Sequence, residues 1–273
     1  METLDRLILE AIKEDMPEGD VTTDALFTDQ TCKAHFIAKQ DGVLSGLDVA
    51  RRVFSIVDAD ATFEARKRNG ETVRKGEVIA VVYGRTASIL KAERIALNFL
   101  QRMSGIATKT AAFVSACAGT KAMILDTRKT TPTLRFLEKR AVADGGGMNH
   151  RMSLSDMAMI KDNHIQAAGS ISAAVAIVRA KVPAGIKVEV EVESVPQFQE
   201  ALSTSCDIVM LDNMATPAMA ECVRLNAGKK KLEASGNMTL ARIPEVAATG
   251  VDYISVGALT HSFESLDVSL RFQ

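Results

Sequence analysis

The stretch DIVMLDNMATPAMAECVRLNAGKKKLEASGN (Asp207–Asn237) contains one complete repeat of the pattern that decides the fold. Two apolar, strand-like runs at 207–211 and 231–234 enclose a helix-prone segment at 218–225. A strand that leads through a helix to the next strand implies parallel pairing with a right-handed crossover. Residues able to do chemistry follow each run, beginning with Asp212 and Ser235. The stretch therefore predicts a parallel sheet with polar groups along one edge.

The same alternation extends over most of the chain beyond Gly119. We predict six strands, at 122–125, 157–160, 187–192, 207–211, 231–234 and 253–256. Helix-prone connections include 171–182, 218–225 and 243–249. Because the active groups of a β/α barrel lie where its strands finish, this arrangement favours a barrel. The alternative is an open doubly wound sheet, which the lack of a GxGxxG sequence after the first strand disfavours.

The segment before Gly119 follows a different plan. Apolar positions from Leu4 to Ile12 keep helical spacing and predict a short helix that ends before Pro17. Short apolar runs between Cys32 and Tyr83 predict a small mixed layer of strands and helices. A long helix is predicted at 89–113, with one apolar stripe. Its polar face is either solvated or supplies charge to a pocket, including one in a neighbouring subunit (Lys91, Arg94, Asn98, Gln101, Arg102).

Composition excludes several classes of function. The 273 residues are 47% apolar and 25% charged with a formal net charge of -1, which indicates a globular protein whose surface is not adapted to nucleic acid. The absence of Trp and the presence of only two Tyr leave few platforms for base stacking. The four cysteines form no CxxC pair, so we expect reduced thiols in a cytoplasmic protein. We expect neither secretion nor membrane insertion, because no run of about twenty apolar residues occurs.

Cations and small residues alternate between Asp126 and Ile165. Four basic residues are interleaved with Thr130-Thr131-Pro132 and Gly145-Gly146-Gly147, namely Arg128, Lys129, Arg151 and Lys161. Two cations held about 4 Å apart at an effective dielectric near 20 repel by roughly 4 kcal/mol. A convergent cluster of this kind requires anions, so the ligand should carry several negative charges.

Small residues follow the last two predicted strands. Ser235-Gly236-Asn237 and Ser255-Val256-Gly257 allow backbone N–H groups to approach a phosphate, as the late loops of a β/α barrel often do. The alternative is that both are ordinary strand-to-helix turns. Their joint placement favours a phosphate site.

Carboxylates gather on two successive predicted strands. Glu191 and Asp212 end these strands, so their side chains face one cavity if the sheet is parallel. Glu189 and Glu193 share the parity of Glu191 and make the first of the two strands unusually acidic. Buried carboxylates require partners, which would be Mg²⁺ or sugar hydroxyls, or else nearby lysines and arginines.

Three other residues leave their roles open. His150 and His164 are candidate general acids or bases, although a lone histidine is more often a hydrogen-bonded structural residue. Lys161 at a strand end is also compatible with a Schiff-base aldolase, which is a different class of enzyme.

Nine ordered motifs give a more specific indication. They are GDVTT (Gly19–Thr23), SGIAT (Ser104–Thr108), DTRKTTP (Asp126–Pro132), GGGMNHR (Gly145–Arg151), IKDNHI (Ile160–Ile165), EVEVES (Glu189–Ser194), LDNM (Leu211–Met214), EASGN (Glu233–Asn237) and GVDYISVGALTHS (Gly250–Ser262). With these motifs the chain resembles, over nearly its full length, the quinolinate phosphoribosyltransferase family, also called nicotinate-nucleotide pyrophosphorylase (carboxylating).

The resemblance implies an α/β fold made of two domains. A smaller N-terminal α/β sandwich domain would cover residues 1–104, with 264–273 returning to it, and an incomplete seven-stranded α/β barrel of the TIM type would cover 105–263. The implied reaction converts quinolinate and phosphoribosyl pyrophosphate to nicotinate mononucleotide, pyrophosphate and CO₂ in NAD biosynthesis, with Mg²⁺ as cofactor. The implied assembly is a homodimer in which Arg94 reaches the neighbouring site, and further assembly into a hexamer is left open.

The resemblance also implies roles for individual residues. The quinolinate carboxylates would contact Arg94 of the neighbour together with Arg128, Lys129, His150 and Arg151, and Thr127 would also bind substrate. Lys161 would lie between quinolinate and pyrophosphate. Glu191 and Asp212 would bind the ribose hydroxyls and Mg²⁺. The 5′-phosphate would be bound by Ala234, Ser235 and Gly236 and by Ser255, Val256 and Gly257. Lys129, Lys161, Glu191 and Asp212 are the implied catalytic residues.

Three departures from the family pattern affect expected binding strength more than reaction type. Thr133 stands where Gly is common, Arg140 where an aromatic residue is common, and Ala143-Asp144 where Arg is frequent. The rival functions are a related phosphoribosyltransferase for another acidic heterocycle, including the relative associated with molybdate-transport operons, and a non-catalytic barrel that binds phosphorylated metabolites.

Overall fold

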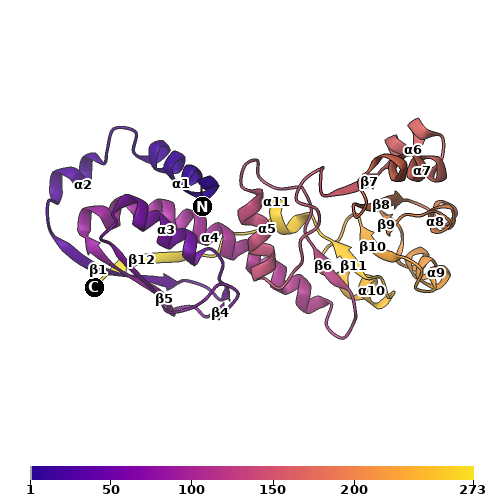
Figure 1. Ribbon diagram of the computed structural model, residues 1–273. Helices are drawn as coiled ribbons and strands as arrows, with labels where there is room; N and C mark the ends of the chain where they lie inside the picture. Colours follow the sequence, from indigo (N-terminus) through magenta and orange to yellow (C-terminus); the bar gives the residue numbers. More distant parts are fainter. Residues whose placement is uncertain (1) are drawn as a thin grey trace. The chain divides into compact units, whose positions relative to one another are not determined.

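The computed structural model describes residues 2–273, which form two compact units (Figure 1). The first unit comprises the chain up to Lys109 together with Ala143–Gly146 and Phe263–Gln273. The second comprises Thr110–Val142 and Gly147–Ser262. No helix within residues 2–273 combines the length and the apolarity that a bilayer crossing requires.

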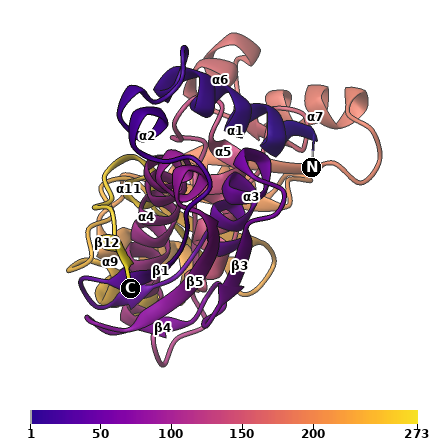
Figure 2. The ribbon, with the colours of Figure 1, turned by 90° about the vertical axis from the view of Figure 1, so that its left-hand side faces the viewer.

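The first unit is built on a four-stranded antiparallel sheet in the order β12-β1-β5-β3. Figure 2 shows β1, β5 and β3 side by side. The last strand of the chain is an edge strand of this sheet, with Ala34 opposite Phe272. The elements are α1 (Glu2–Asp15), α2 (Val21–Leu26), β1 (Thr31–Ala38), β2 (Gly42–Val43), α3 (Leu47–Val57), β3 (Thr62–Ala65), β4 (Thr72–Val73), β5 (Val78–Arg85) and β12 (Val268–Phe272).

Three phenylalanines form the centre of this unit. Phe36 on β1, Phe54 on α3 and Phe63 on β3 contact one another with ring centroids 5.5 to 5.9 Å apart, and Phe36 and Phe54 meet edge to face. Aromatic pairs at this spacing add to the stabilisation from burial alone. The cluster joins one face of the sheet to α3.

The long helix α4 (Thr86–Ala116) begins in the first unit and continues past Lys109. Its predicted apolar stripe is buried, and Ile89, Ala92 and Ala96 are fully inaccessible. The residues of the predicted polar face of α4 differ in their surroundings. Gln101 donates to the carbonyl of Val268 and Arg102 lies over the Phe263 ring, whereas Arg94 and Asn98 are exposed.

Two of the sequence motifs have local structural roles here. In GDVTT, the Asp20 carboxylate accepts the backbone N–H groups of Thr22 and Thr23 and caps α2. In SGIAT, Gly105 lies against the segment that follows the second unit, and a Cβ at this position would come within 2.2 Å of the Glu264 carbonyl oxygen. These motifs therefore shape the first unit.

The second unit is a parallel sheet in the order β6-β11-β10-β9-β8-β7, which confirms the α/β class and all six predicted strands. Its strands are β6 (Met123–Leu125), β7 (Met157–Ile160), β8 (Lys187–Val192), β9 (Ile208–Asp212), β10 (Lys231–Ser235) and β11 (Tyr253–Ser255). Its helices are α5 (Arg135–Asp144, whose last two residues are in the first unit), α6 (Asp162–Ala168), α7 (Ile171–Lys181), α8 (Val195–Leu202), α9 (Thr216–Asn226), α10 (Ile243–Ala248) and α11 (Ala258–His261).

A seventh segment extends this sheet by one residue. Met148 forms an isolated parallel bridge with Leu125 of β6, and its N–H donates to the Ile124 carbonyl. The chain then runs on to β7, the strand at the opposite end of the sheet order. The predicted seven strands are thus six strands and a bridge, and closure of the barrel stays a prediction.

The first unit contains a buried carboxylate whose contribution to stability depends on pH. Asp58 accepts from Arg85 Nε at 2.8 Å and from Ser88 Oγ at 2.6 Å, which lowers its pKa to about 2. A carboxyl with a depressed pKa stabilises the fold above its unfolded pKa and loses that contribution as the pH falls towards the folded value.

We therefore expect Asp58→Asn to lower the free energy of unfolding by about 1 to 2 kcal/mol at neutral pH. The difference from the parent protein should shrink between about pH 4 and pH 2. Urea unfolding across this range tests it, and a constant difference at every pH would contradict the assignment.

Candidate active site

A pocket of about 830 Å³ lies where the strands of the parallel sheet end. All of its walls come from the second unit. The lining residues are Thr127, Arg128, Lys129, His150, Arg151, Met159, Lys161, Glu191, Met210, Asp212, Asn213, Glu233, Ser235, Gly236, Asn237, Met238, Thr239, Ser255, Gly257, Ala258 and His261.

Twelve of the predicted site residues therefore meet in one pocket, and three do not line it. Ala234 and Val256 are buried in the strand region, at 0% and 1% exposure. Arg94 belongs to the first unit and is exposed on α4. His164 is not a lining residue either. It is exposed, and its Nδ1 accepts the backbone N–H of Lys161 at the start of α6.

Three cations in the pocket, called here the cationic cluster (Arg128, Lys129 and Arg151), have no carboxylate partner among the described residues. Arg128 has a buried Nε without a hydrogen-bond partner. Arg151 donates to the Met157 carbonyl at 3.0 Å, and no ion pair joins its guanidinium to a described carboxylate. Burial, and then the charge of Arg128, lower the pKa of the Arg151 guanidinium. An anion is the ligand that such a cluster favours.

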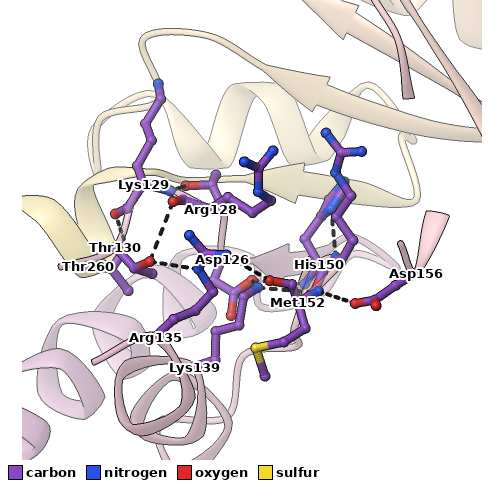
Figure 3. A network of polar contacts seen from close by, with 12 residues as sticks. Asp126, Arg128, Lys129, Thr130, Arg135, Lys139, His150, Met152, Asp156 and Thr260 are labelled. Atoms are coloured by element: carbon purple, nitrogen blue, oxygen red, sulfur yellow. Dashed lines mark hydrogen bonds and ion pairs between the residues drawn. The ribbon is translucent and has the colours of Figure 1, made fainter. Parts of the chain in front are cut away.

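Asp126, the acidic residue of the DTRK sequence, does not neutralise the cationic cluster. It is fully buried and forms an ion pair with the equally buried Lys139 of α5. Its Oδ1 also accepts the backbone N–H of His150 at 2.8 Å, and Lys139 Nζ donates to the His150 carbonyl at 3.0 Å. Figure 3 shows that Arg128 and Lys129 point away from this pair.

Asn149 completes this arrangement. With its amide nitrogen facing the two oxygens, it donates to Asp126 Oδ2 at 2.7 Å and to the Lys139 carbonyl at 2.8 Å. Burial raises the pKa of Asp126 and lowers that of Lys139, while their pairing opposes both changes. The ion pair thus connects the loop that carries Arg128 to the loop that carries Arg151.

A second buried group lies beside the cationic cluster. His150 Nε2 is 3.1 Å from Glu189 Oε2 and 3.5 Å from Glu233 Oε2, and its Nδ1 accepts the backbone N–H of Arg151 at 2.8 Å. Burial lowers the pKa of His150, whereas the bonds to the two carboxylates raise it and favour a proton on Nε2, the ring nitrogen that faces them. Burial and the charge of Glu233 raise the pKa of Glu189 to about 7.

The position of the proton in this group follows from geometry. Because the Arg151 N–H points at Nδ1, that nitrogen has no space for a proton of its own. The imidazole therefore carries its proton on Nε2.

The two predicted acidic residues have different partners. Glu191 Oε2 is 2.6 Å from Lys161 Nζ, so the alternative of pairing with a lysine holds for Glu191 in this structure. Asp212 accepts from the amide of Asn213 at 2.7 Å and has no cationic partner among the described residues. Both carboxylates line the pocket and remain candidate ligands of a sugar or a cation.

The small-residue loops meet at a constrained backbone. Asn213, Gly236 and Asn237 all have positive φ, at 52°, 89° and 50°. A Cβ on Gly236 would come within 2.2 Å of Asn213 Oδ1, so only glycine fits there. Asn237 Nδ2 donates to Asn213 Oδ1 at 3.2 Å, and Ser255 Oγ is buried without a partner. Unmet donors and strained backbone at one pocket wall are typical of a binding site.

Several lining residues were not predicted, and a signal for three of them exists in the sequence. Side chains two positions apart on a strand share a face. Each of the three stands two positions before a predicted residue: Met159 before Lys161, Met210 before Asp212 and Glu233 before Ser235. Glu189 stands in the same relation to Glu191, but it is fully buried and contacts His150 instead of lining the pocket.

Comparison with known proteins identifies the family. The model for the N-terminal domain of quinolinate phosphoribosyl transferase matches residues 20–104, and the model for its C-terminal domain matches residues 106–271. The chain belongs to the quinolinate phosphoribosyltransferase family.

Individual relatives agree with this family over nearly the whole chain. A probable nicotinate-nucleotide pyrophosphorylase [carboxylating] of Bacillus subtilis is 42% identical over 267 residues, which cover 98% of this chain and 92% of that protein. Quinolinate phosphoribosyltransferase [decarboxylating] 1b of Nicotiana tabacum is 44% identical, with 96% and 80% covered. The crystal structure of NadC from Streptococcus pyogenes superposes with a TM-score of 0.96 at 43% identity, covering 99% and 97%.

Two departures from the family pattern have structural consequences. Thr133 has a φ of 69°, a conformation that strains a β-branched residue and suits the glycine that the family resemblance implies at this position. Asp144 accepts from Ser45 Oγ at 2.6 Å within the first unit and is not a lining residue of the pocket.

The buried ion pair makes a prediction about stability. We expect Lys139→Met to destabilise the protein by about 3 to 5 kcal/mol, because Asp126 would be left buried without its counter-charge. Adding Asp126→Asn should recover part of this loss, since the uncompensated charge is removed. Urea unfolding of both single variants and the double variant measures the coupling, and additive effects would contradict the pairing.

Proposed function

We propose that this protein, a quinolinate phosphoribosyltransferase by family, uses the pocket of its second unit for catalysis. The reaction transfers the phosphoribosyl group of phosphoribosyl pyrophosphate to quinolinate, with loss of CO₂, and forms nicotinate mononucleotide and pyrophosphate in NAD biosynthesis. The assignment rests on the cationic cluster, which has no ion-pair partner within the described part of the chain, in one pocket with the Glu191 and Asp212 carboxylates and a constrained small-residue loop.

Quinolinate fits the cationic cluster because its two carboxylates are negative and the three side chains of the cluster are positive. We assign its two carboxylates to Arg128 and Arg151, with Lys129 and the Thr127 hydroxyl beside them. Nicotinate has one carboxylate and would leave a buried cation unpaired. A site built to pair both charges discriminates strongly against a ligand that lacks one of them.

The activated sugar fits the other side of the pocket. Asp212 and Glu191 are assigned to the ribose hydroxyls, and Lys161 to the region between quinolinate and pyrophosphate. The 5′-phosphate is assigned to the backbone of Ala234–Gly236 and Ser255–Gly257, where Ser255 Oγ has no partner. When the substrates bind, the ion pair between Lys161 and Glu191 would either break or stay intact while both side chains contact the substrates.

Mg²⁺ fits the donors of the pocket. Glu191 and Asp212 are carboxylates on neighbouring strands, and Mg²⁺ prefers a few carboxylates together with substrate phosphate oxygens. When bound, the ion would take up charge that develops on the pyrophosphate leaving group.

The chemistry requires positioning and charge stabilisation more than a strong base. The pyridine nitrogen forms a bond to ribose C1 while the C1–oxygen bond breaks and its electron pair leaves with pyrophosphate. Glu191 and Asp212 stabilise the developing positive charge of the sugar. Loss of the adjacent carboxylate as CO₂ leaves an electron pair at the ring carbon, next to the cationic nitrogen, and a proton then replaces CO₂.

The assembly and location belong to the same proposal. An exposed Arg94 on α4 supports a homodimer in which this side chain reaches the pocket of the partner subunit. No feature of the described residues favours assembly beyond the dimer. Four free cysteines support a cytoplasmic location.

Rival functions differ in measurable outcomes. A phosphoribosyltransferase for another acidic heterocycle would not release one CO₂ per quinolinate consumed. A Schiff-base aldolase would be trapped at Lys161 by borohydride with a carbonyl substrate. A regulatory barrel would bind ligand without turnover.

The activity test combines substrates with variants of the cationic cluster. Purified protein with quinolinate, phosphoribosyl pyrophosphate and Mg²⁺ should form nicotinate mononucleotide and an equal amount of CO₂. Arg151→Ala should lower kcat/KM for quinolinate by about 2 to 5 kcal/mol, the loss expected for a buried charge pair, and Lys129→Ala, at an exposed side chain, should lower it less. Lys75→Ala, at an exposed turn of the first unit, is the matched control. Near-parental kinetics in both pocket variants would contradict the carboxylate assignment.

The shared site makes a separate prediction. Arg94→Ala and Lys161→Ala should each be inactive alone, whereas mixed dimers of the two should regain activity, because one of the two pockets then has both side chains. Activity is measured after co-expression with two affinity tags and isolation of heterodimers. Verified heterodimers that remain inactive would exclude donation of Arg94.

A further inference from the structure

A buried group of ionisable side chains beside the pocket is formed by His150, Glu189 and Glu233. Glu189 on β8 is inaccessible, and Glu233 on β10 is 1% exposed. One ligand atom from each of the three residues lies within 4.8 Å of those from the others. Burying two carboxylates together is costly, so this arrangement requires a compensating role.

The hydrogen bonds of His150 leave neither ring nitrogen for a substrate. Nε2 donates to Glu189 Oε2 at 3.1 Å, with Glu233 Oε2 at 3.5 Å, and Nδ1 accepts the Arg151 N–H at 2.8 Å. A neutral imidazole has one donor and one acceptor, so only the tautomer protonated on Nε2 satisfies both sides. This differs from the sequence-based expectation that His150 contacts quinolinate directly.

Arg151 is the residue that this tautomer holds. Its backbone N–H is fixed by His150, and its guanidinium is fixed by the Met157 carbonyl and lies 3.5 Å from Met159 Sδ. The side chain is therefore anchored at both ends, and its charge remains free for an anion. A guanidinium that pairs with a planar carboxylate depends on such preorganisation.

We propose that Glu189 and Glu233 are positioning residues for the quinolinate site, which they serve by fixing the Nε2-protonated tautomer of His150 so that Nδ1 holds Arg151. The proposal rests on the function assigned above to the pocket. His150 lines the pocket and acts on the site through the backbone of Arg151.

The three residues are also a possible set of ligands for a cation, and the geometry argues against that role. A metal ion on Nε2 would displace the proton that bonds to Glu189. The distance of 3.1 Å from Nε2 to Glu189 Oε2 is that of a direct hydrogen bond, and Glu233 Oε2 lies farther away, at 3.5 Å. Elemental analysis is nevertheless part of the test, because a stoichiometric metal ion that is lost in Glu189→Gln would overturn the proposal.

Two substitutions of His150 separate positioning from direct binding. An asparagine amide at this position would keep an acceptor near the Nδ1 site, whereas a glutamine amide would keep a donor near the Nε2 site. We therefore expect His150→Asn to retain a KM for quinolinate within about threefold of the parent, and His150→Gln to raise it about tenfold or more. In both variants the KM for phosphoribosyl pyrophosphate and kcat should change little. The reverse order of the two variants would show that Nε2 contacts the substrate and would overturn the proposal.

Glu189→Gln tests the carboxylates themselves. It should raise the KM for quinolinate about tenfold in the parent protein and have little effect in the His150→Asn background, where no tautomer remains to be fixed. Equal effects in both backgrounds would indicate a purely structural role and would overturn the proposal.

Nitrogen-15 spectra of the His150 ring provide a readout without turnover. The proposal predicts a protonated Nε2 and a bare Nδ1, and a protonated Nδ1 would contradict it. The kinetic results also separate the two levels of the argument. A parent protein that releases no CO₂ from quinolinate defeats the proposed function, whereas an active parent with unchanged KM in His150→Gln defeats this inference alone.

Discussion

The ion pair between Asp126 and Lys139 is the interaction on which the candidate site depends. Both side chains are fully buried, and the carboxylate also holds the backbone of His150 and the amide of Asn149. The pair thereby connects the end of β6 to the loop before β7, two segments that are distant in the sequence but carry the cationic cluster between them. The desolvation of two buried charges offsets much of their Coulombic attraction. The main effect of this ion pair is therefore to fix the positions of the two loops.

This pairing also determines the charge of the pocket. Asp126 stands two residues from Arg128, and an Asp–Arg contact would have neutralised part of the cationic cluster. Instead the chain supplies Lys139 from α5 as the partner, and Arg128, Lys129 and Arg151 keep their charges for a ligand. Glu189 and Glu233 follow the same principle, because they bond to His150 rather than to Arg151. Acidic residues are present around the site, but their geometry leaves the cations uncompensated.

The sequence predicted those features that depend on local pattern. Strand periodicity indicated all six strands of the parallel sheet, and because parallel strands end at one edge, residues from Thr127 to Gly257 could be expected in one pocket. The unpredicted features depend on contacts between distant residues. Lys139 lies in a segment whose composition resembles that of a surface helix, and nothing local indicates that it is buried against Asp126. Glu189 was one of the carboxylates expected to pair with Mg²⁺, sugar hydroxyls, or a lysine or arginine. Its partner His150 follows only once β8 and the loop before β7 are packed together. The alternation of side chains along a strand predicts on which face of the sheet each one lies, but not which distant residue it contacts.

The central claim is that the cationic cluster is kept uncompensated for a ligand with two carboxylates. A crystal structure of the protein with quinolinate tests this most directly. The account predicts that one carboxylate contacts the Arg128 guanidinium and the other the Arg151 guanidinium, while Asp126 remains paired with Lys139. Quinolinate bound through a single carboxylate, or bound elsewhere while Asp126 turns to Arg128, would contradict it.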